Sequence, residues 1–493
     1  ERKDLVFCGR TLLGAPAPKG QEMEDHYFGT LKPKVAAYMH DLDVELWKLG
    51  IPAKTKHNEV APAQHELAPV FDTTNVAVDH NQLTMEIMKK VADKHDLVCL
   101  LHEKPFEGIN GSGKHNNWSM ITDDGVNLLD PGKTPSENIQ FLVFLMAVIK
   151  AVDEYADLLR ISVASAGNDH RLGANEAPPA VVSIFLGDEL TEVLKAIEND
   201  TYFTSHGAVQ MDIGATVLPH FVKDNTDRNR TSPFAFTGNK FEFRMLGSAA
   251  SVANPNIVLN TAVAEALDQF AKELDGVAPE DMEHAVHELI KRAIKKHKRV
   301  IFNGNGYTDE WIEEAEKRGL YNLKSTPDAL PMWIAQKNID LFTKHSIFTS
   351  EELHSRYEIW LENYSKTINI ESNTMVEMVQ KDLLPSVMSY IEEIASTASL
   401  KASVVPGITC ESETALITKL SGLQDAMTKG LEKLKSDTAK AKATEDVLEN
   451  AKLYQAEVLE DMEELRKSAD EAETLIPDDL LPYPTYGKLL FYI

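Results

Sequence analysis

The chain has 493 residues, 43% of them hydrophobic, and 77 acidic against 50 basic side chains give it a formal net charge of −27. This length is enough for two or three domains. The phosphate backbone of a nucleic acid repels so acidic a chain, which argues against non-specific nucleic-acid binding. The excess of carboxylates can instead serve to bind cations. The three cysteines are widely spaced and form no CxxC pair, which is typical of a protein from a reducing cytoplasm.

Helices are predicted first near 33–49 and 78–95, on either side of a segment with alternating character. A long buried helix is predicted over 134–160. Its apolar run "FLVFLMAVI" at 141–149 is too short to span a bilayer, and charged residues follow it at once. No association with a membrane is therefore expected.

Strand-like pieces follow within 208–247, and a further helix is predicted to open at Asn254-Pro255 because proline fits a first helical turn. From about residue 320 onward helical patterns dominate. Two apolar stripes there predict an antiparallel coiled-coil hairpin over about 412–475, joined by "DTAKAKATED" and typical of an assembly element. The stripes comprise Leu416, Leu420, Leu423, Met427, Leu431 and Leu434, then Val447, Ala451, Tyr454, Val458, Met462, Leu465, Ala469 and Ala472. The apolar tail "YPTYGKLLFYI" is expected to dock back on the body.

The segment "HNEVAPAQHEL" carries Glu59 and Glu66, seven residues apart. On one straight strand an odd spacing places two side chains on opposite faces. A bend at Ala61-Pro62-Ala63 would let both point to one site, where two carboxylates suit Mg²⁺ or Mn²⁺. The alternative is two solvated glutamates.

The stretch "EGINGSGKHNNWSM" matches seven of the eight positions of a phosphate-binding P-loop, but His115 stands where a magnesium-binding Ser or Thr belongs. A P-loop lysine also opens a helix, and "HNNWSMITDDG" is a poor start for one. The P-loop interpretation therefore fails. A glycine-permitted turn remains, with His115 as a metal ligand or, alternatively, as a structural histidine.

The strand "NKFEFRML" places Lys240, Glu242 and Arg244 on one face and apolar side chains on the other. The polar face either lines a cleft for a cation and anionic oxygens or is an ordinary exposed strand. Two loops, "NDHRLGANEAPPA" and "DRNRTSPFAF", carry further charged groups, including Arg171 and Arg230. Together these carboxylates, arginines and glycines are typical of phosphoryl transfer, in which positioning and charge neutralisation supply most of the catalysis.

In their order, these motifs resemble glutamine synthetase, and most closely its type III class. The matching pieces are "HNEVAPAQHEL", "NGSGKHNNWS", "RLGANEAP", "NRTS" with "KFEFR", and "ANPN", over about residues 5–320. The resemblance implies an α+β fold with a curved antiparallel sheet and outer helices. It places the catalytic domain in 1–320 and a helical C-terminal extension in 321–493. It also implies a cytoplasmic homo-oligomer of hexameric rings, a dodecamer for the full-length protein.

The resemblance implies the reaction and the metals. Members of this family join glutamate and ammonia with ATP, through γ-glutamyl phosphate. Two or more Mg²⁺ or Mn²⁺ ions serve each site. Glu59 and Glu66 correspond to ligands of the first metal, and His115 and Glu242 to ligands of the second.

The resemblance also implies which residues contact the substrates. On the glutamate side, Asn110 and Gly111 contact backbone groups, Arg171 binds the carboxylate, and Glu176 closes the site and accepts a proton from ammonium. On the phosphate side the corresponding residues are Arg230 and Arg244, which neutralise the transferring group, and Ser119 and Lys240, which lie near the nucleotide.

Three departures from the family pattern stand out. Asn117 occupies the place of a second histidine, which leaves its role open, and Ala235 lies near the place of a second arginine. A strand with two glutamates one residue apart, expected upstream, has no counterpart in 1–30, where only "EMED" has that spacing. These features predict a chain truncated at its N-terminus, which is itself expected to be less active or inactive.

Two other functions stay open. One is a related carboxylate–amine ligase that uses another amine. The other is a non-catalytic, metal-binding assembly subunit whose helical hairpin is its working part.

Overall fold

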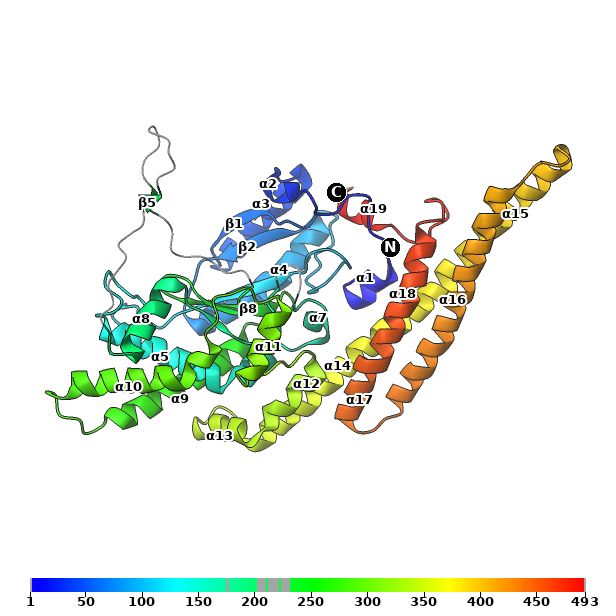
Figure 1. The fold of residues 1–493 in the computed structure, drawn as a ribbon. Coiled ribbons are helices and arrows are strands. Elements are labelled where there is room, and N and C mark those ends of the chain that lie inside the picture. Colours follow the sequence, from blue (N-terminus) through cyan, green and yellow to red (C-terminus); the bar gives the residue numbers. More distant parts are fainter. Residues whose placement is uncertain (1, 174–176, 202–209, 212–220, 223–230, 492–493) are drawn as a thin grey trace. The chain divides into compact units, whose positions relative to one another are not determined.

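The computed structural model of the chain describes residues 2–173, 177–201, 210–211, 221–222 and 231–491 (Figure 1). These residues form two compact units, and each unit draws on separate stretches of the sequence. Unit 1 comprises Glu1–Ser112, Ser165–His170 and Arg356–Ile493, and unit 2 comprises Gly113–Ala164 and Arg171–Ser355. The predicted domain boundary after residue 320 stays a prediction. Within the described part of the chain, no helix combines the length and the apolar content needed to cross a bilayer.

The N-terminal part of unit 1 packs two helices against a two-stranded hairpin. Helices α3 (Pro33–Lys48) and α4 (Thr74–Lys94) share a core with the hairpin of β1 (Ala53–Asn58) and β2 (His65–Pro69). That core contains Leu42, Leu46, Ile51, Ala53 and Val91. The two predicted helices are thus confirmed, the second beginning earlier than expected. The short helices of this unit are α1 (Lys3–Cys8), α2 (Asp25–Phe28), α7 (Ala166–Asp169) and α19 (Tyr486–Phe491).

Long helices form the C-terminal part of unit 1. The first run consists of α14 (Ser350–Met378), the π-helical turn η3 (Val379–Leu383) and α15 (Leu384–Val404). Proline lacks an N–H and crowds the carbonyl four residues earlier, which explains the wide turn just before Pro385.

The predicted coiled-coil hairpin follows this run. Helix α16 (Glu411–Lys442) packs against α15 and against α18 (Leu459–Glu473), and α17 (Val447–Leu453) and η4 (Tyr454–Val458) lead into α18 (Figure 1). The predicted stripes are buried, apart from their partly exposed ends Leu416 and Val447. Most of the predicted linker is helical, because Thr438 and Ala441 bury their side chains and so extend α16.

A buried ionic cluster connects the N-terminal segment of unit 1 to α14. The Arg10 guanidinium donates from Nε and Nη2 to the two carboxylate oxygens of Glu371, over 2.9 and 2.8 Å. Both side chains are buried, at 8% and 2% exposure. Two causes lower the pKa of His102 to about 4 and that of His170 to about 3. The larger is burial, and the second is the positive charge of Arg10. The cluster therefore holds one ion pair and two neutral imidazoles near neutral pH.

Because the pKa values of His102 and His170 are lowered in the folded chain, we expect the free energy of unfolding to fall in mild acid. Between their lowered folded-state pKa values and the ordinary value of 6.5, the unfolded chain binds protons that the folded chain does not. Stability is therefore unaffected by them above pH 6.5 and falls as the pH drops. From pH 7 to pH 5 we expect a loss of about 2 kcal/mol for each histidine. Urea unfolding at both pH values measures it.

Two variants test the source of this pH dependence. His102→Gln should reduce the acid-induced loss by about 2 kcal/mol, which is the share of one histidine. His40→Gln, which changes an exposed histidine of α3, should leave the loss as it is in the parent. Equal pH dependence in all three proteins would contradict the assignment.

Unit 2 is built around a four-stranded sheet in the order β3 (Gly113–Trp118), β8 (Phe241–Gly247), β7 (Phe234–Phe236) and β4 (Ile184–Phe185). The β3–β8 and β8–β7 pairs are antiparallel, and β7–β4 is parallel. A further antiparallel pair joins β5 (Gln210–Met211) and β6 (Phe221–Val222). The predicted α+β class is confirmed, with small separate sheets among the described residues.

Helices pack on this sheet. Phe141 of α5 (Ile139–Glu154) contacts Phe236 of β7, with ring centroids 5.9 Å apart. Where the sequence predicted one helix over 134–160, α5 begins later, at a cap formed by Asn138, and breaks at Tyr155 before α6 (Ala156–Ile161). The other helices are α8 (Asp188–Glu198), α9 (Ala253–Leu274), α10 (Met282–His297), η1 (Lys298–Val300), α11 (Asp309–Lys317), α12 (Thr326–Ala329), η2 (Leu330–Ile334) and α13 (Gln336–Lys344). The helix predicted at Asn254-Pro255 is α9.

Candidate active site

The β1–β2 hairpin of unit 1 presents the paired glutamates. Its register places His57 opposite Glu66, and the Glu59 amide donates to the Gln64 carbonyl over 2.9 Å, which continues the pairing to the turn. Ala63, in the turn, adopts a left-handed backbone conformation with φ of 57°. The expected bend is present, and the two carboxylates come to one side of the hairpin despite their odd spacing.

His57 lies between the two glutamates. Its Nε2 is 2.8 Å from Glu66 Oε2, and its Nδ1 is 3.8 Å from Glu59 Oε1. One ligand atom from each of the three residues lies within 4.8 Å of the others. Two carboxylates and an imidazole form a donor set that suits Mn²⁺ or Mg²⁺. Sequence reasoning missed His57, although its place two residues before Glu59 on a strand puts both on one face.

The glycine-rich loop of unit 1 is closed by local hydrogen bonds. The Ser112 amide donates to the Glu103 carbonyl over 2.8 Å, and Lys104 Nζ donates to the Ile109 carbonyl over 2.5 Å. Gly108, inside the loop, has a φ of 74°, a conformation that favours glycine. After the loop the chain enters strand β3 rather than a helix, which rules out a P-loop.

Two glutamines hold the predicted glutamate-binding residues. The Asn110 amide donates to Gln21 Oε1 over 2.9 Å, and Gln21 Nε2 donates to Asn110 Oδ1 over 2.5 Å. Gln64 of the hairpin turn donates to the Gly111 carbonyl over 3.1 Å. The loop with Asn110 and Gly111 is thus tied directly to the hairpin with Glu59 and Glu66. Apart from its polarity, nothing in the sequence distinguishes Gln21 as a residue of this site.

In unit 2, strands β3 and β8 bring His115, Glu242 and Arg244 together. The register between the strands shifts between Lys114 and Asn116, at His115. His115 Nδ1 is 2.8 Å from Glu242 Oε1, and Arg244 Nη2 donates to Glu242 Oε2 over 2.9 Å. Glu242 and Arg244 are buried, at 8% and 3% exposure, so this polar face is not an ordinary exposed strand.

The environment of Glu242 keeps it ionised. Burial alone would raise its pKa, but the His115 hydrogen bond and the Arg244 charge outweigh burial and lower the pKa to about 2. A full negative charge is therefore present at any pH near neutrality. A carboxylate beside an imidazole nitrogen can serve as a pair of ligands for a divalent cation, and the neighbouring arginine can bind anionic oxygens.

Arg171 is also buried in unit 2. Its Nη1 donates to the Leu246 carbonyl of β8 over 3.1 Å. A Cβ atom at Gly113 would lie 2.1 Å from Arg171 Nη2, so a side chain at the start of β3 would displace this guanidinium. This contact explains the second glycine of "GSGKH". The role of Arg171 as a ligand of the substrate carboxylate stays a prediction.

The remaining predicted residues occupy varied positions. Ser119, which follows β3, has its hydroxyl 2.7 Å from Asn127 Oδ1 and 3.1 Å from the carbonyl oxygen of Asn239, the residue before the partly exposed Lys240. Asn117 is exposed and pairs with Glu242 across the strands. Glu176 and Arg230 lie outside the described residues.

Comparison with known proteins defines the family of this chain. The family model "glutamine synthetase, catalytic domain" matches residues 14–182, and "glutamine synthetase C-terminal domain" matches 285–401. A glutamine synthetase of Butyrivibrio fibrisolvens is 61% identical over 100% of this chain and 70% of its own length. The type-3 glutamine synthetase of Dictyostelium discoideum is 47% identical over 99% of this chain and 67% of its own. A glutamine synthetase of Bacteroides fragilis is 41% identical over 99% and 68%.

Glutamine synthetases are ATP-dependent ligases that use divalent metals. The chain belongs to the glutamine synthetase family, and the predicted family and enzyme class are confirmed. The relative named type-3 agrees with the predicted class within the family.

Proposed function

We propose that the chain joins ammonia to the side-chain carboxylate of L-glutamate at the expense of ATP, through γ-glutamyl phosphate. The observation that carries this proposal is the arrangement of His115, Glu242 and Arg244 on adjacent strands. It combines a permanently ionised carboxylate, an imidazole at 2.8 Å and an arginine at 2.9 Å. Such a group can hold a cation and an anionic oxygen side by side, as phosphoryl transfer to a carboxylate requires.

In this proposal two donor sets hold Mn²⁺ or Mg²⁺. Glu59 and Glu66 hold the first ion, with His57 beside them, and His115 and Glu242 hold the second. When bound, a divalent ion neutralises charge on phosphoryl and carboxylate oxygens.

The other residues bind and orient the substrates in this proposal. Asn110 and Gly111 contact the backbone groups of glutamate, and Arg171 contacts its carboxylate. Arg244 and Arg230 neutralise the transferring phosphoryl group because guanidinium pairs with phosphate in a bidentate geometry. Further roles are assigned to Glu176, which accepts a proton from ammonium, and to Ser119 and Lys240, which contact the nucleotide. We also propose a ring-shaped homo-oligomer for the full-length protein.

Release of ADP in a mixture of ATP, glutamate, ammonium and Mn²⁺ tests the proposal, with each component omitted in turn. We expect release that needs all four and yields one glutamine per ADP. Release that requires another amine in place of ammonium would indicate a related ligase. Metal-dependent nucleotide binding without release would favour the non-catalytic alternative.

A further inference from the structure

The C-terminal tail packs under the predicted glutamate loop. Tyr486 and Leu490 of α19 share a buried apolar cluster with Ala61 of the hairpin turn and Ile109 of the loop. The ring of Phe106 packs edge-on against Tyr486, with centroids 5.2 Å apart. All these residues belong to unit 1. The expected docking of the tail is therefore observed, and its partners are the two segments that present the predicted metal and glutamate ligands.

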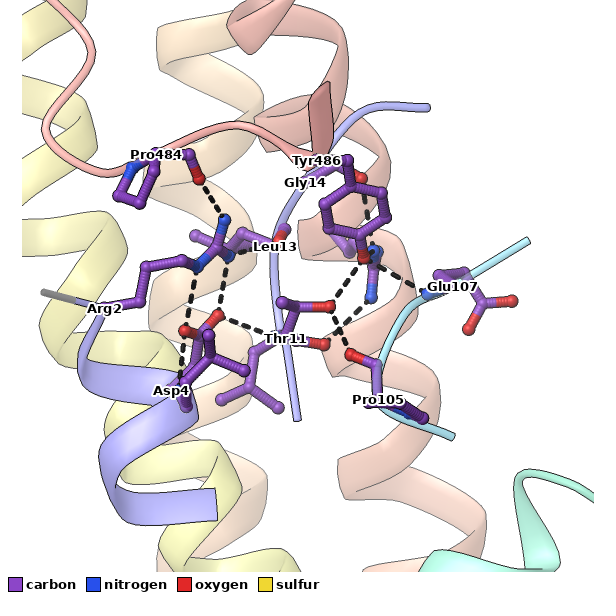
Figure 2. A network of polar contacts seen from close by, with 12 residues as sticks. Arg2, Asp4, Thr11, Leu13, Gly14, Pro105, Glu107, Pro484 and Tyr486 are labelled. Atoms are coloured by element: carbon purple, nitrogen blue, oxygen red, sulfur yellow. Dashed lines mark hydrogen bonds and ion pairs between the residues drawn. The ribbon is translucent and has the colours of Figure 1, made fainter. Parts of the chain in front are cut away.

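The Tyr486 hydroxyl lies at the centre of a polar network (Figure 2). It accepts from the Glu107 amide over 3.1 Å and from Arg466 Nη2 over 2.8 Å. It lies 2.6 Å from Thr11 Oγ1, which in turn donates to the Pro105 carbonyl over 2.8 Å. Since a phenol has one proton and two acceptor positions, it donates to Thr11 and its hydrogen-bonding capacity is filled.

The network holds the residues that lead into the loop through contacts from the N-terminal segment and from the C-terminal helices. The Thr11 amide also donates to the Pro105 carbonyl, over 2.9 Å. Arg466 of α18 reaches the Gly14 carbonyl over 3.2 Å, so the coiled-coil hairpin, the N-terminal segment and the tail are joined at one point. At Gly14 a Cβ would lie 2.3 Å from the Tyr486 ring, so glycine is required for this close approach. Asn110 follows Glu107 by only three residues.

We propose that Tyr486, held by Arg466, is a positioning residue for the glutamate loop, through which the C-terminal extension sets the affinity for glutamate. This inference rests on the proposed function for its substrate. In this proposal the tail acts on the loop backbone and not on the substrate. It fixes the Pro105 carbonyl and the Glu107 amide, and thereby the backbone from which Asn110 and Gly111 are presented. A loop that must be ordered by its ligand binds more weakly than one ordered beforehand.

Tyr486→Phe tests the proposal, with Tyr483→Phe as its matched control. Both tyrosines are buried in the same tail, at 1% and 6% exposure. The Tyr483 hydroxyl has no hydrogen-bond partner among the described residues, and its ring keeps the Arg2 guanidinium at 4.6 Å whether or not the hydroxyl is present. The two variants remove the same atom, and only the first removes contacts to the loop.

Two measurements are made on the full chain. In Tyr486→Phe we expect the KM for glutamate to rise about 5- to 30-fold, with the KM for ATP unchanged. Hydrogen exchange of the peptide that covers 105–112 should accelerate by a similar factor, while peptides of α3 and α4 keep their rates. Tyr483→Phe should match the parent in both.

Parental exchange of 105–112 in Tyr486→Phe would overturn the proposal. So would faster exchange throughout unit 1 together with equal changes in both KM values, because this indicates general destabilisation. If the parent chain releases no ADP with glutamate, the proposed function fails separately. The exchange measurement still decides whether Tyr486 holds the loop.

Discussion

Replacing Glu242 by glutamine is expected to lower kcat/KM for glutamine synthesis about 100- to 1,000-fold. Glutamine has the same shape as glutamate and can still accept a hydrogen bond from Arg244. It lacks the negative charge that a pKa of about 2 guarantees in the parent. A cation beside His115 then loses its anionic ligand, and the Arg244 guanidinium loses the counter-charge that lies 2.9 Å away.

Initial rates over a range of Mn²⁺ concentrations measure the effect, because a lost metal ligand shifts the Mn²⁺ requirement upward as well as lowering the rate. Glu313→Gln is the control. It makes the same chemical change in unit 2 on an exposed side chain of α11, whose lysine partner is 3.9 Å away. Near-UV circular dichroism verifies that the fold is kept. Parental activity in Glu242→Gln would refute its role as a ligand.

The elements that the sequence predicted correctly are those specified by nearby residues. A stripe with steps of three and four residues defines a helix face, so the sequence alone predicts that Leu420, Met427 and Leu434 lie in the hairpin core, where they are buried. A proline and small residues between two polar strands indicate a turn, and this was enough to bring Glu59 and Glu66 together.

Contacts between distant segments were beyond prediction. The alternation in "NKFEFRML" shows which residues share a face of β8, but it carries no information about what covers that face. Only the packing of unit 2 reveals that Glu242 is buried and not solvated. Likewise, the tail was recognised as apolar, yet nothing local identifies Thr11 and Glu107 as partners of Tyr486.

Breaking the buried ion pair between Arg10 and Glu371 is expected to destabilise the chain strongly. Glu371→Gln leaves the Arg10 guanidinium buried and without a counter-charge, next to two histidines that burial keeps neutral. The expected loss in the free energy of unfolding is about 3–5 kcal/mol. The matched control on the same helix is Glu362→Gln, whose exposed pair with Lys366 should contribute under about 0.5 kcal/mol.

A double-mutant cycle separates the cost of an unpaired charge from the value of the pair itself. Arg10→Met should be about as damaging as Glu371→Gln, whereas Arg10→Met combined with Glu371→Leu should recover most of the loss, because no charge is then left buried. Urea unfolding followed by circular dichroism gives the four free energies. Additive effects of Arg10→Met and Glu371→Leu would mean that the two side chains act independently. Strong coupling would establish that this bidentate contact of 2.8 and 2.9 Å helps to hold the N-terminal segment, which leads to Thr11 and Gly14, on α14. In that case Glu371→Gln should also accelerate hydrogen exchange at 105–112, since Thr11 would lose its support beside the loop.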